Sequence, residues 1–167
     1  MIDSVVPEAE LKVLFVCSGN ICRSPTADGV FRHLIVQAGL QNKVLVDSAG
    51  TLDYHVGSPP DRRSVRAAAR RGYELGALRA RQLASADYAD FDYLLAMDRE
   101  HLAIMQSSAP PEHQKKIALM LDFSDRYRGN EVPDPYYGGP QGFEHVLDLI
   151  EDGATGLLSE IGRRLAM

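Results

Sequence analysis

The sequence predicts an α/β protein, a three-layer sandwich with a central parallel sheet of about four strands flanked by helices. Short apolar segments alternate along the chain with longer segments whose apolar residues recur at helical spacing. Strands that are joined through helices pair in parallel. The first apolar run, residues 13–16, contains no polar residue, which is typical of a strand covered on both faces.

The length of 167 residues suits one domain with a core of its own. We expect residues 1–10 to form a short N-terminal extension and residues 11–167 to form that domain. Residues 1–10 lack the basic start and apolar core of a signal peptide, and no run approaches a membrane span, so we expect no membrane association. The two cysteines indicate a reducing, cytoplasmic location rather than a disulfide scaffold, and the net charge of −5 disfavours nucleic-acid binding.

The segment that follows the first strand reads as an anion-binding loop. Cys17 ends the apolar run, and Ser24 and Pro25 are suited to the N-cap and first position of a helix. A loop over a helix N-terminus has unpaired N–H groups, which attract phosphate or another oxyanion. Glycine and asparagine within the loop tolerate positive φ. The residues expected to contact the bound group are Ser18, Gly19, Asn20, Ile21, Cys22 and Ser24.

Two side chains give this loop possible chemistry. A helix N-terminus and a neighbouring arginine favour the thiolate form of a cysteine, so Cys17 is a candidate nucleophile. Arg23 offers a planar fork that matches two phosphoryl oxygens, and the Ser24 hydroxyl can donate to the sulfur. The alternative is that Cys17 is only a small buried core residue.

The remaining elements follow in order. Helices are expected over 25–38, 61–71, 99–107 and 143–165, and strands over 44–47, 91–97 and 116–121, with a long loop over 122–142. Gly153 and Gly156 are expected to bend the last helix. The arginines of the helix over 61–71 are either a polyanion site or a solvated face, and we interpret them as a solvated face.

A second catalytic group is expected in the long loop, because cleavage of a phosphate ester needs a proton on the departing oxygen. Asp134 is the candidate, since Pro133 and Pro135 stiffen the chain on both sides. Asp122 and Asp125 are alternatives by position, and any of the three can be an ordinary surface carboxylate.

Residues 17–25, Cys-Ser-Gly-Asn-Ile-Cys-Arg-Ser-Pro, resemble the signature of the low-molecular-weight protein tyrosine phosphatases, and residues 134–138, Asp-Pro-Tyr-Tyr-Gly, resemble that family's second motif. Residues 47–50, 81–83 and 91–98 follow the family's order, so the resemblance spans roughly 11–166.

The resemblance implies the same fold and the hydrolysis of phosphotyrosine in proteins and of aryl phosphates. Cys17 would form a phosphocysteine, Arg23 would clamp the phosphate, and Asp134 would serve as general acid and base. We expect no metal or other cofactor, tyrosine-phosphorylated proteins as partners, and a monomer or weak dimer.

Three tyrosines are candidates for the walls of the substrate slot. Tyr54, Tyr136 and Tyr137 could stack on a phenyl ring and favour phosphotyrosine over phosphoserine. The alternative is that Tyr137 packs internally while Tyr136 is exposed to solvent.

The sequence departs from the family pattern at three positions. Ser18 replaces a larger apolar residue, Arg71 stands where a histidine near the loop-supporting network is common, and His101 replaces an asparagine. Cys22 is either the partner of Cys17 in a protective disulfide or a buried, inert thiol.

Competing functions are a non-enzymatic phosphate-binding or redox-regulated module, an arsenate reductase and a thiol oxidoreductase. An arsenate reductase would need a further cysteine after Cys22, and the chain has none. A thiol oxidoreductase would use a Cys-x-x-Cys spacing.

Overall fold

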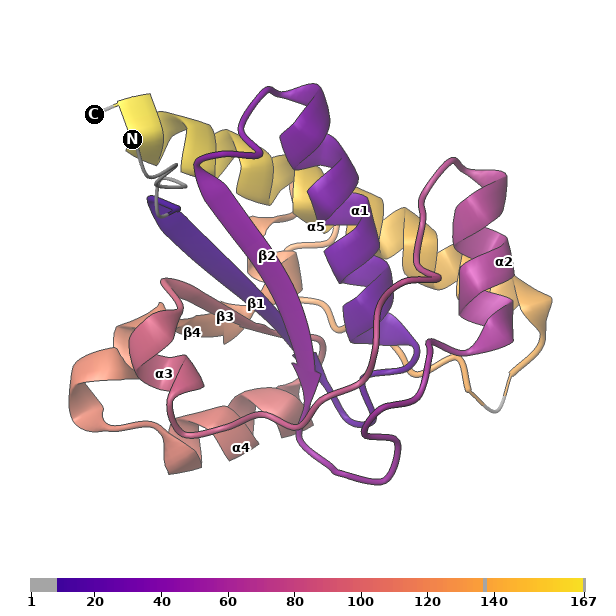
Figure 1. The fold of residues 1–167 in the computed structure, drawn as a ribbon, viewed down its shortest axis with the longest axis horizontal. Coiled ribbons are helices and arrows are strands. Elements are labelled where there is room, and N and C mark those ends of the chain that lie inside the picture. The colour runs from indigo at the N-terminus through magenta and orange to yellow at the C-terminus, as the bar shows by residue number, and fades with distance from the viewer. Residues whose placement is uncertain (1–8, 137, 167) are drawn as a thin grey trace, which may run out of the picture.

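The computed structural model describes residues 9–136 and 138–166 and has the predicted three-layer architecture (Figure 1). Of the extension expected over residues 1–10, only residues 9 and 10 belong to the described part. The elements in chain order are β1 (Leu11–Cys17), α1 (Arg23–Gln37), β2 (Val44–Gly50), α2 (Arg62–Arg70), α3 (Asp87–Asp90), β3 (Tyr93–Ala96), α4 (Arg99–Ser108), the 3-10 helix η1 (Pro111–Lys116), β4 (Ile117–Leu119), the 3-10 helix η2 (Met120–Phe123) and α5 (Pro140–Ala166). The described strands are all parallel, in the order β2-β1-β3-β4.

Strand β1 is buried on both faces, which explains its continuous apolar run. On one face Phe15 meets Phe31 of α1 edge to face, with 5.8 Å between ring centroids, within a core that α5 completes. On the other face Leu14 and Val16 pack with Met105 of α4. In Figure 1 α1, α2 and α5 lie on one side of the sheet, and α3 and α4 lie on the other.

The strands differ from their expected lengths because pairing sets their ends. Strand β2 continues to Gly50, since its residues pair in register with β1 as far as Cys17. Strand β4 is confined to Ile117–Leu119 between two 3-10 helices that the sequence patterns did not reveal. None of the described helices combines the length and apolar character that a membrane span requires.

The expected N-cap at Ser24 is wrong. Helix α1 begins at Arg23, after Cys22 at the cap position, so Ser24 lies inside the first turn. Its hydroxyl lies close to Cys17 and Asn20 rather than capping the helix. At the other end of the chain α5 starts at Pro140, one turn before the expected position, with proline in the first helical place.

The glycines of α5 allow close packing, and the helix runs through both of them without interruption. A Cβ on Gly153 would lie 3.1 Å from Leu121 Cδ2, and a Cβ on Gly156 would lie 1.6 Å from the carbonyl oxygen of Phe123. Both glycines therefore let α5 approach η2, whose residues precede the long loop.

We predict that Gly156→Ala destabilises the protein by about 1–3 kcal/mol, because the backbone of η2 must move to accommodate the methyl group. Gly162→Ala is the matched control, since a Cβ at that exposed helical position meets no atom of the described residues within 4 Å. The control should be neutral or stabilising by up to about 1 kcal/mol. Urea unfolding followed by circular dichroism measures both variants, and equal stabilities would contradict the packing role of Gly156.

Candidate active site

The loop between β1 and α1 lies at the carboxyl edge of the sheet, where parallel sheets bind ligands. Strand β1 sits between β2 and β3 and ends at the buried Cys17. Helix α1 begins at Arg23. Residues 18–22 therefore lie at the start of α1, where the first N–H groups have no intrahelical partner and the helix dipole is positive.

Asn20 fixes the conformation of this loop. It is buried and adopts φ 56°, and no other non-glycine residue of the described chain has a positive φ. Its side-chain amide donates to the hydroxyls of Ser24 at 2.8 Å and Ser48 at 2.9 Å, and its side-chain carbonyl accepts from the Arg81 N–H at 3.0 Å. These bonds hold in place a backbone conformation that most residues avoid.

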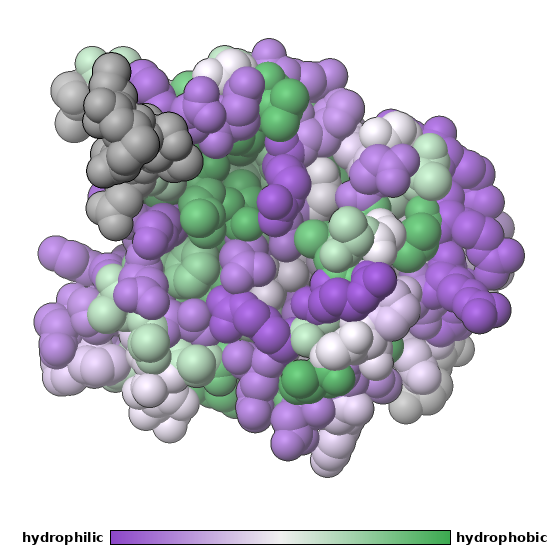
Figure 2. All heavy atoms as spheres, in the orientation of Figure 1, coloured by the Kyte–Doolittle hydropathy of each residue, from purple (hydrophilic) through white to green (hydrophobic). Residues whose placement is uncertain are grey.

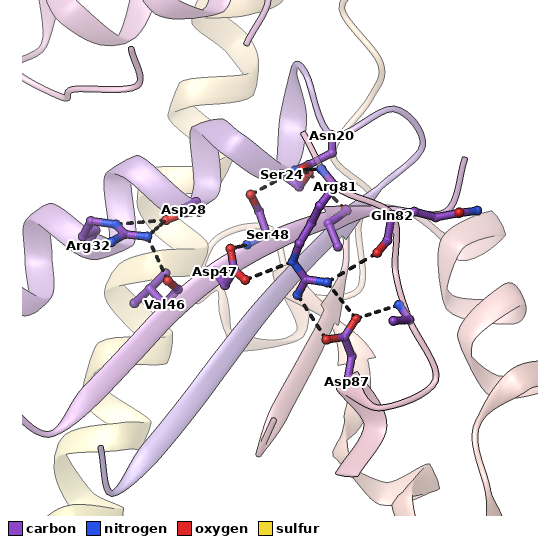
Figure 3. Close-up of polar contacts among 12 residues, drawn as sticks. Asn20, Ser24, Asp28, Arg32, Val46, Asp47, Ser48, Arg81, Gln82 and Asp87 are labelled. Atoms are coloured by element: carbon purple, nitrogen blue, oxygen red, sulfur yellow. Dashed lines mark hydrogen bonds and ion pairs between the residues drawn. The ribbon is translucent and has the colours of Figure 1, made fainter. Parts of the chain in front are cut away.

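The segment around Arg81 is itself anchored (Figure 3). The Arg81 guanidinium binds Asp47 on β2 at 3.1 Å and binds both carboxylate oxygens of Asp87 on α3 at 3.0 and 3.1 Å. A Cβ on Gly50 would lie only 2.6 Å from the Ser18 carbonyl oxygen, so glycine lets β2 approach the loop. Residues 47–50 and 81–83 thus pack against the loop and hold it in position.

The Cys17 sulfur lies 2.9 Å from the Ser24 hydroxyl oxygen. Either atom can be the donor in this contact, and the Ser24 hydroxyl also accepts from Asn20 and lies 3.4 Å from the Ala49 carbonyl oxygen. Asn20 and Ser24 hold the loop and contact the Cys17 side chain but do not line the cavity described below.

Arg23 is held in place before any ligand arrives. Its side chain is 4% exposed, and Nη1 donates to Asp98 Oδ2 at 2.7 Å and to the Val132 carbonyl at 3.1 Å. Nη2 lies 3.8 Å from Asp134 Oδ2. The guanidinium therefore joins the loop to the N-terminus of α4 and to the loop that precedes α5.

Asp98 and His101 form a polar pair at the start of α4. Asp98 is the N-cap and accepts from the His101 N–H at 3.0 Å. Burial opposes ionisation of Asp98, but hydrogen bonds from His101 and Arg23 and their charges lower its pKa overall. Burial, reinforced by the charge of Arg23, lowers the pKa of His101 to about 4, so the ring is neutral at pH 7.

Ser18 and His101, both departures from the family pattern, contact each other. The Ser18 hydroxyl lies 2.8 Å from His101 Nε2. Which of these two atoms donates depends on the tautomer of the ring, whose Nδ1 lies 3.0 Å from Asp98 Oδ1. The polar substitution in the loop is thus matched by a polar partner under it.

A cavity of about 210 Å³ opens over the loop. Its lining comprises Cys17, Ser18, Gly19, Ile21, Cys22 and Arg23 as floor, with Leu52, Tyr54, His55, Asp134 and Tyr136 as walls. The floor comes from the β1–α1 connection. The walls come from the β2–α2 and η2–α5 connections.

The cavity distinguishes among the three candidate acids. Asp134 lines it, and its Oδ1 accepts from the Tyr136 N–H at 3.0 Å, which orients the carboxylate. Asp122 instead accepts from the Leu119 N–H at 3.3 Å within η2, and Asp125 is exposed. Neither of these two lines the cavity.

Tyr54 and Tyr136 both lie at the rim, with exposed fractions of 79% and 38%. The third predicted wall residue, Tyr137, lies outside the described residues. The sequence patterns missed Leu52 and His55. The His55 ring lies against the loop, because a Cβ on Gly19 would come within 2.9 Å of its Cδ2.

Cys22 is buried beside the cavity. Burial, with the charge of Asp61, raises the pKa of its thiol to about 12, so Cys22 is protonated at neutral pH. Cys17 and Cys22 are both free thiols in the structure, and the protective disulfide stays a prediction.

Arg71, at the position where a histidine near the loop-supporting network is common, pairs with α5. It follows α2 and pairs with three carboxylates of α5, namely Glu144 at 2.9 Å, Asp148 at 3.0 Å and Glu151 at 2.5 Å. Its role is to tie α2 to α5. The supporting contacts of the loop come from Ser48 and Arg81 instead.

Comparison with known proteins decides the family. A family model described as low molecular weight phosphotyrosine protein phosphatase matches residues 12–166. The chain belongs to this family. The expectation of a cysteine-dependent phosphatase of this low molecular weight class is thereby confirmed.

Individual members of the low molecular weight phosphatase family agree in sequence and fold. A putative low molecular weight protein-tyrosine-phosphatase of Synechocystis sp. is 46% identical over 93% of this chain and 99% of its own length. A protein tyrosine phosphatase of Entamoeba histolytica with Hepes in the active site superposes with a TM-score of 0.89 at 40% identity, covering 92% and 97% of the two chains. Vibrio vulnificus Wzb in complex with benzylphosphonate superposes with a TM-score of 0.79 at 30% identity, covering 91% and 99%.

We predict that His101 makes the stability of this phosphatase depend on pH between about 4 and 6.5. In this window the unfolded state binds a proton at His101 that the folded state does not bind, so raising the pH favours folding. The free energy of unfolding of the wild type relative to His101→Gln should therefore rise by up to about 3 kcal/mol from pH 4 to pH 6.5.

Urea titrations across this pH range measure the difference. His145→Gln, at an exposed position of α5, is the matched control. The assignment to His101 would be contradicted if the difference in unfolding free energy between the wild type and His101→Gln did not change with pH. It would also be contradicted if the difference for His145→Gln changed equally with pH.

Proposed function

We propose that the protein hydrolyses phosphotyrosine in proteins, and simple aryl phosphates, through a phosphocysteine on Cys17. The observation that carries this proposal is that the Cys17 sulfur, the Arg23 guanidinium and the Asp134 carboxylate line one cavity at the start of a helix. Each group has the chemistry that one step of phosphate-ester hydrolysis requires.

Binding of the phosphate uses the loop and Arg23. The equatorial oxygens of the phosphoryl group accept hydrogen bonds from the N–H groups of residues 18–22 and from the guanidinium edge not bonded to Asp98. Since Asp98 and the Val132 carbonyl already hold Arg23, little side-chain entropy is lost when the phosphate binds.

In the first chemical step the Cys17 thiolate attacks phosphorus in line with the leaving oxygen. A P–S bond forms as the P–O bond to the phenol breaks, and the bonding electron pair leaves with the phenolic oxygen. Asp134 gives its proton to that oxygen. In the second step Asp134 accepts a proton from water, which attacks phosphorus and releases inorganic phosphate and the thiolate.

Selectivity for an aryl ester follows from the walls of the cavity. Tyr54 and Tyr136 flank the entrance and can stack on the phenyl ring of the substrate. A phosphoserine is shorter and would leave these aromatic faces exposed to water. The benzylphosphonate bound by the Vibrio vulnificus relative has the same combination of an aromatic ring and a phosphorus oxyanion.

Tyrosine-phosphorylated proteins are the proposed partners. The protein that acts on them is proposed to be a monomer or weak dimer in the cytoplasm. A reducing compartment suits the proposed activity, because its nucleophile is a free thiol that oxidation would inactivate.

We predict that Asp134→Ala lowers kcat about 10²- to 10⁴-fold for aryl phosphates with poor leaving groups, because Asp134 is the only carboxyl group among the described residues that line the cavity. The loss should shrink for para-nitrophenyl phosphate, whose phenol departs more readily as an anion. Asp125→Ala removes an exposed carboxylate outside the cavity and should leave kcat unchanged. Steady-state kinetics over a series of substituted phenyl phosphates tests this, and an equal loss for every leaving group would exclude Asp134 as the acid.

Cys17→Ser should abolish turnover while phosphate still binds the loop. Rapid acid quenching followed by mass spectrometry should find the phosphoryl group on Cys17 of the wild type. The group on another side chain, or turnover by Cys17→Ser equal to that of the wild type, would overturn Cys17 as the nucleophile, and absence of turnover by the wild type would leave only a phosphate-binding module.

A further inference from the structure

A second hollow, of about 230 Å³, has no part in the proposed chemistry. Its lining residues are Arg63, Arg66, Arg70, Pro140 and Phe143, and we call it the arginine groove. The three arginines lie on one face of α2, because residues three or four positions apart share a face of a helix. Figure 2 shows hydrophilic residues over the edge of the molecule where α2 lies.

The three guanidinium groups differ in how far they are neutralised. Arg63 binds Asp61 through Nε at 3.1 Å and Nη2 at 2.9 Å. Arg70 has only a long, exposed contact of 3.4 Å with Glu144. Arg66 is exposed and has no hydrogen-bond or ion-pair partner among the described residues. Arg66 is therefore the cation most available to an outside ligand.

The carboxylates of α5 that lie near α2 are mostly engaged elsewhere. Asp148 and Glu151 pair with Arg71, which does not line the groove, and Glu144 also lies closer to Arg71 than to Arg70. These carboxylates therefore pair mainly with Arg71, which follows the C-terminal end of α2. The positive charge at Arg66 is not cancelled within the groove.

The arginine groove adjoins the catalytic cavity. The guanidinium carbon of Arg63 lies 4.7 Å from the ring centroid of Phe143 in the groove and 5.3 Å from that of Tyr136. Tyr136 in turn is a wall of the cavity. One guanidinium therefore contacts both the groove and the wall that a bound phosphotyrosine would touch.

We infer that the arginine groove binds acidic side chains that flank the phosphotyrosine of a protein substrate, and this inference rests on the proposed function. Guanidinium forks bind carboxylates well, and Phe143 and Pro140 can pack against the methylene stem of a glutamate. An extended chain advances about 3.3 Å per residue, so side chains a few positions from the phosphotyrosine reach a neighbouring hollow. The protein as a whole has a net charge of −5, so an acidic substrate gains from a local cation.

The test compares two phosphotyrosine peptides of equal length, one flanked by glutamates and one by glutamines, with para-nitrophenyl phosphate as the small substrate. The wild type should turn over the acidic peptide with the higher kcat/KM. Arg66→Glu should lower kcat/KM for the acidic peptide about 3- to 10-fold, mainly through KM, and Arg66→Gln should have a smaller effect. The preference should weaken as salt is added.

Arg163→Glu is the matched control, because it makes the same charge change on an exposed arginine roughly 30 Å along α5 from Phe143. It should leave the preference intact. The groove proposal would be overturned if the wild type had equal kcat/KM for the two peptides, or if Arg66→Glu and Arg163→Glu had equal effects. The proposed function would still stand in either case as long as para-nitrophenyl phosphate is turned over. Absence of wild-type turnover of all three substrates would overturn both.

Discussion

The hydrogen bonds of one buried carboxamide, that of Asn20, hold the active-site loop in its conformation. The chain must turn between β1 and α1 within residues 18–22, and it does so with Asn20 in the left-handed region at φ 56°. The contacts of Asn20 reach α1, β2 and the segment after α2. Three such bonds, at about 1 kcal/mol each, offset a backbone cost of about 1 kcal/mol or more.

Local patterns explain which parts of the site could be anticipated. The strand, loop and helix over residues 11–37 follow from an apolar run, a Gly-Asn pair and a proline, all adjacent in the sequence. Ser24 was misassigned as a helix cap because its hydroxyl contacts Cys17 and Asn20, which a capping rule does not consider. His55 and the Ser18–His101 contact depend on segments distant in the sequence, and spacing alone does not bring them together.

The same distinction holds for the carboxylates. Spacing leaves Asp122 and Asp125 as alternatives to Asp134, whereas only Asp134 of the three lines the cavity of the folded chain. The bend expected at Gly153 and Gly156 stays a prediction, and a packing reason for the glycine at position 156 lies in the folded chain. Helix propensity describes an isolated helix, but the glycine is used where α5 meets the backbone of η2.

Electrostatics reconcile an acidic protein with an anionic ligand. Arg23 is buried, and burial of a charge is tolerable here because Asp98 and the Val132 carbonyl accept its hydrogen bonds. Because His101 is neutral, it does not compete with Arg23 for the Asp98 carboxylate. Asp98 therefore remains the counter-ion of Arg23. Positive charge is thus available at the loop although the protein as a whole carries a net charge of −5.

The cavity floor comes from the β1–α1 connection, whereas its walls come from two other connections whose Leu52, Tyr54, His55, Asp134 and Tyr136 belong to neither buried core. The η2–α5 connection carries Asp134, the proposed acid, whereas the β2–α2 connection contributes only walls. Evolution can lengthen, shorten or exchange the β2–α2 segment without repacking the sheet, and a chimaera that carries this segment of a relative can acquire new selectivity over an unchanged cavity floor.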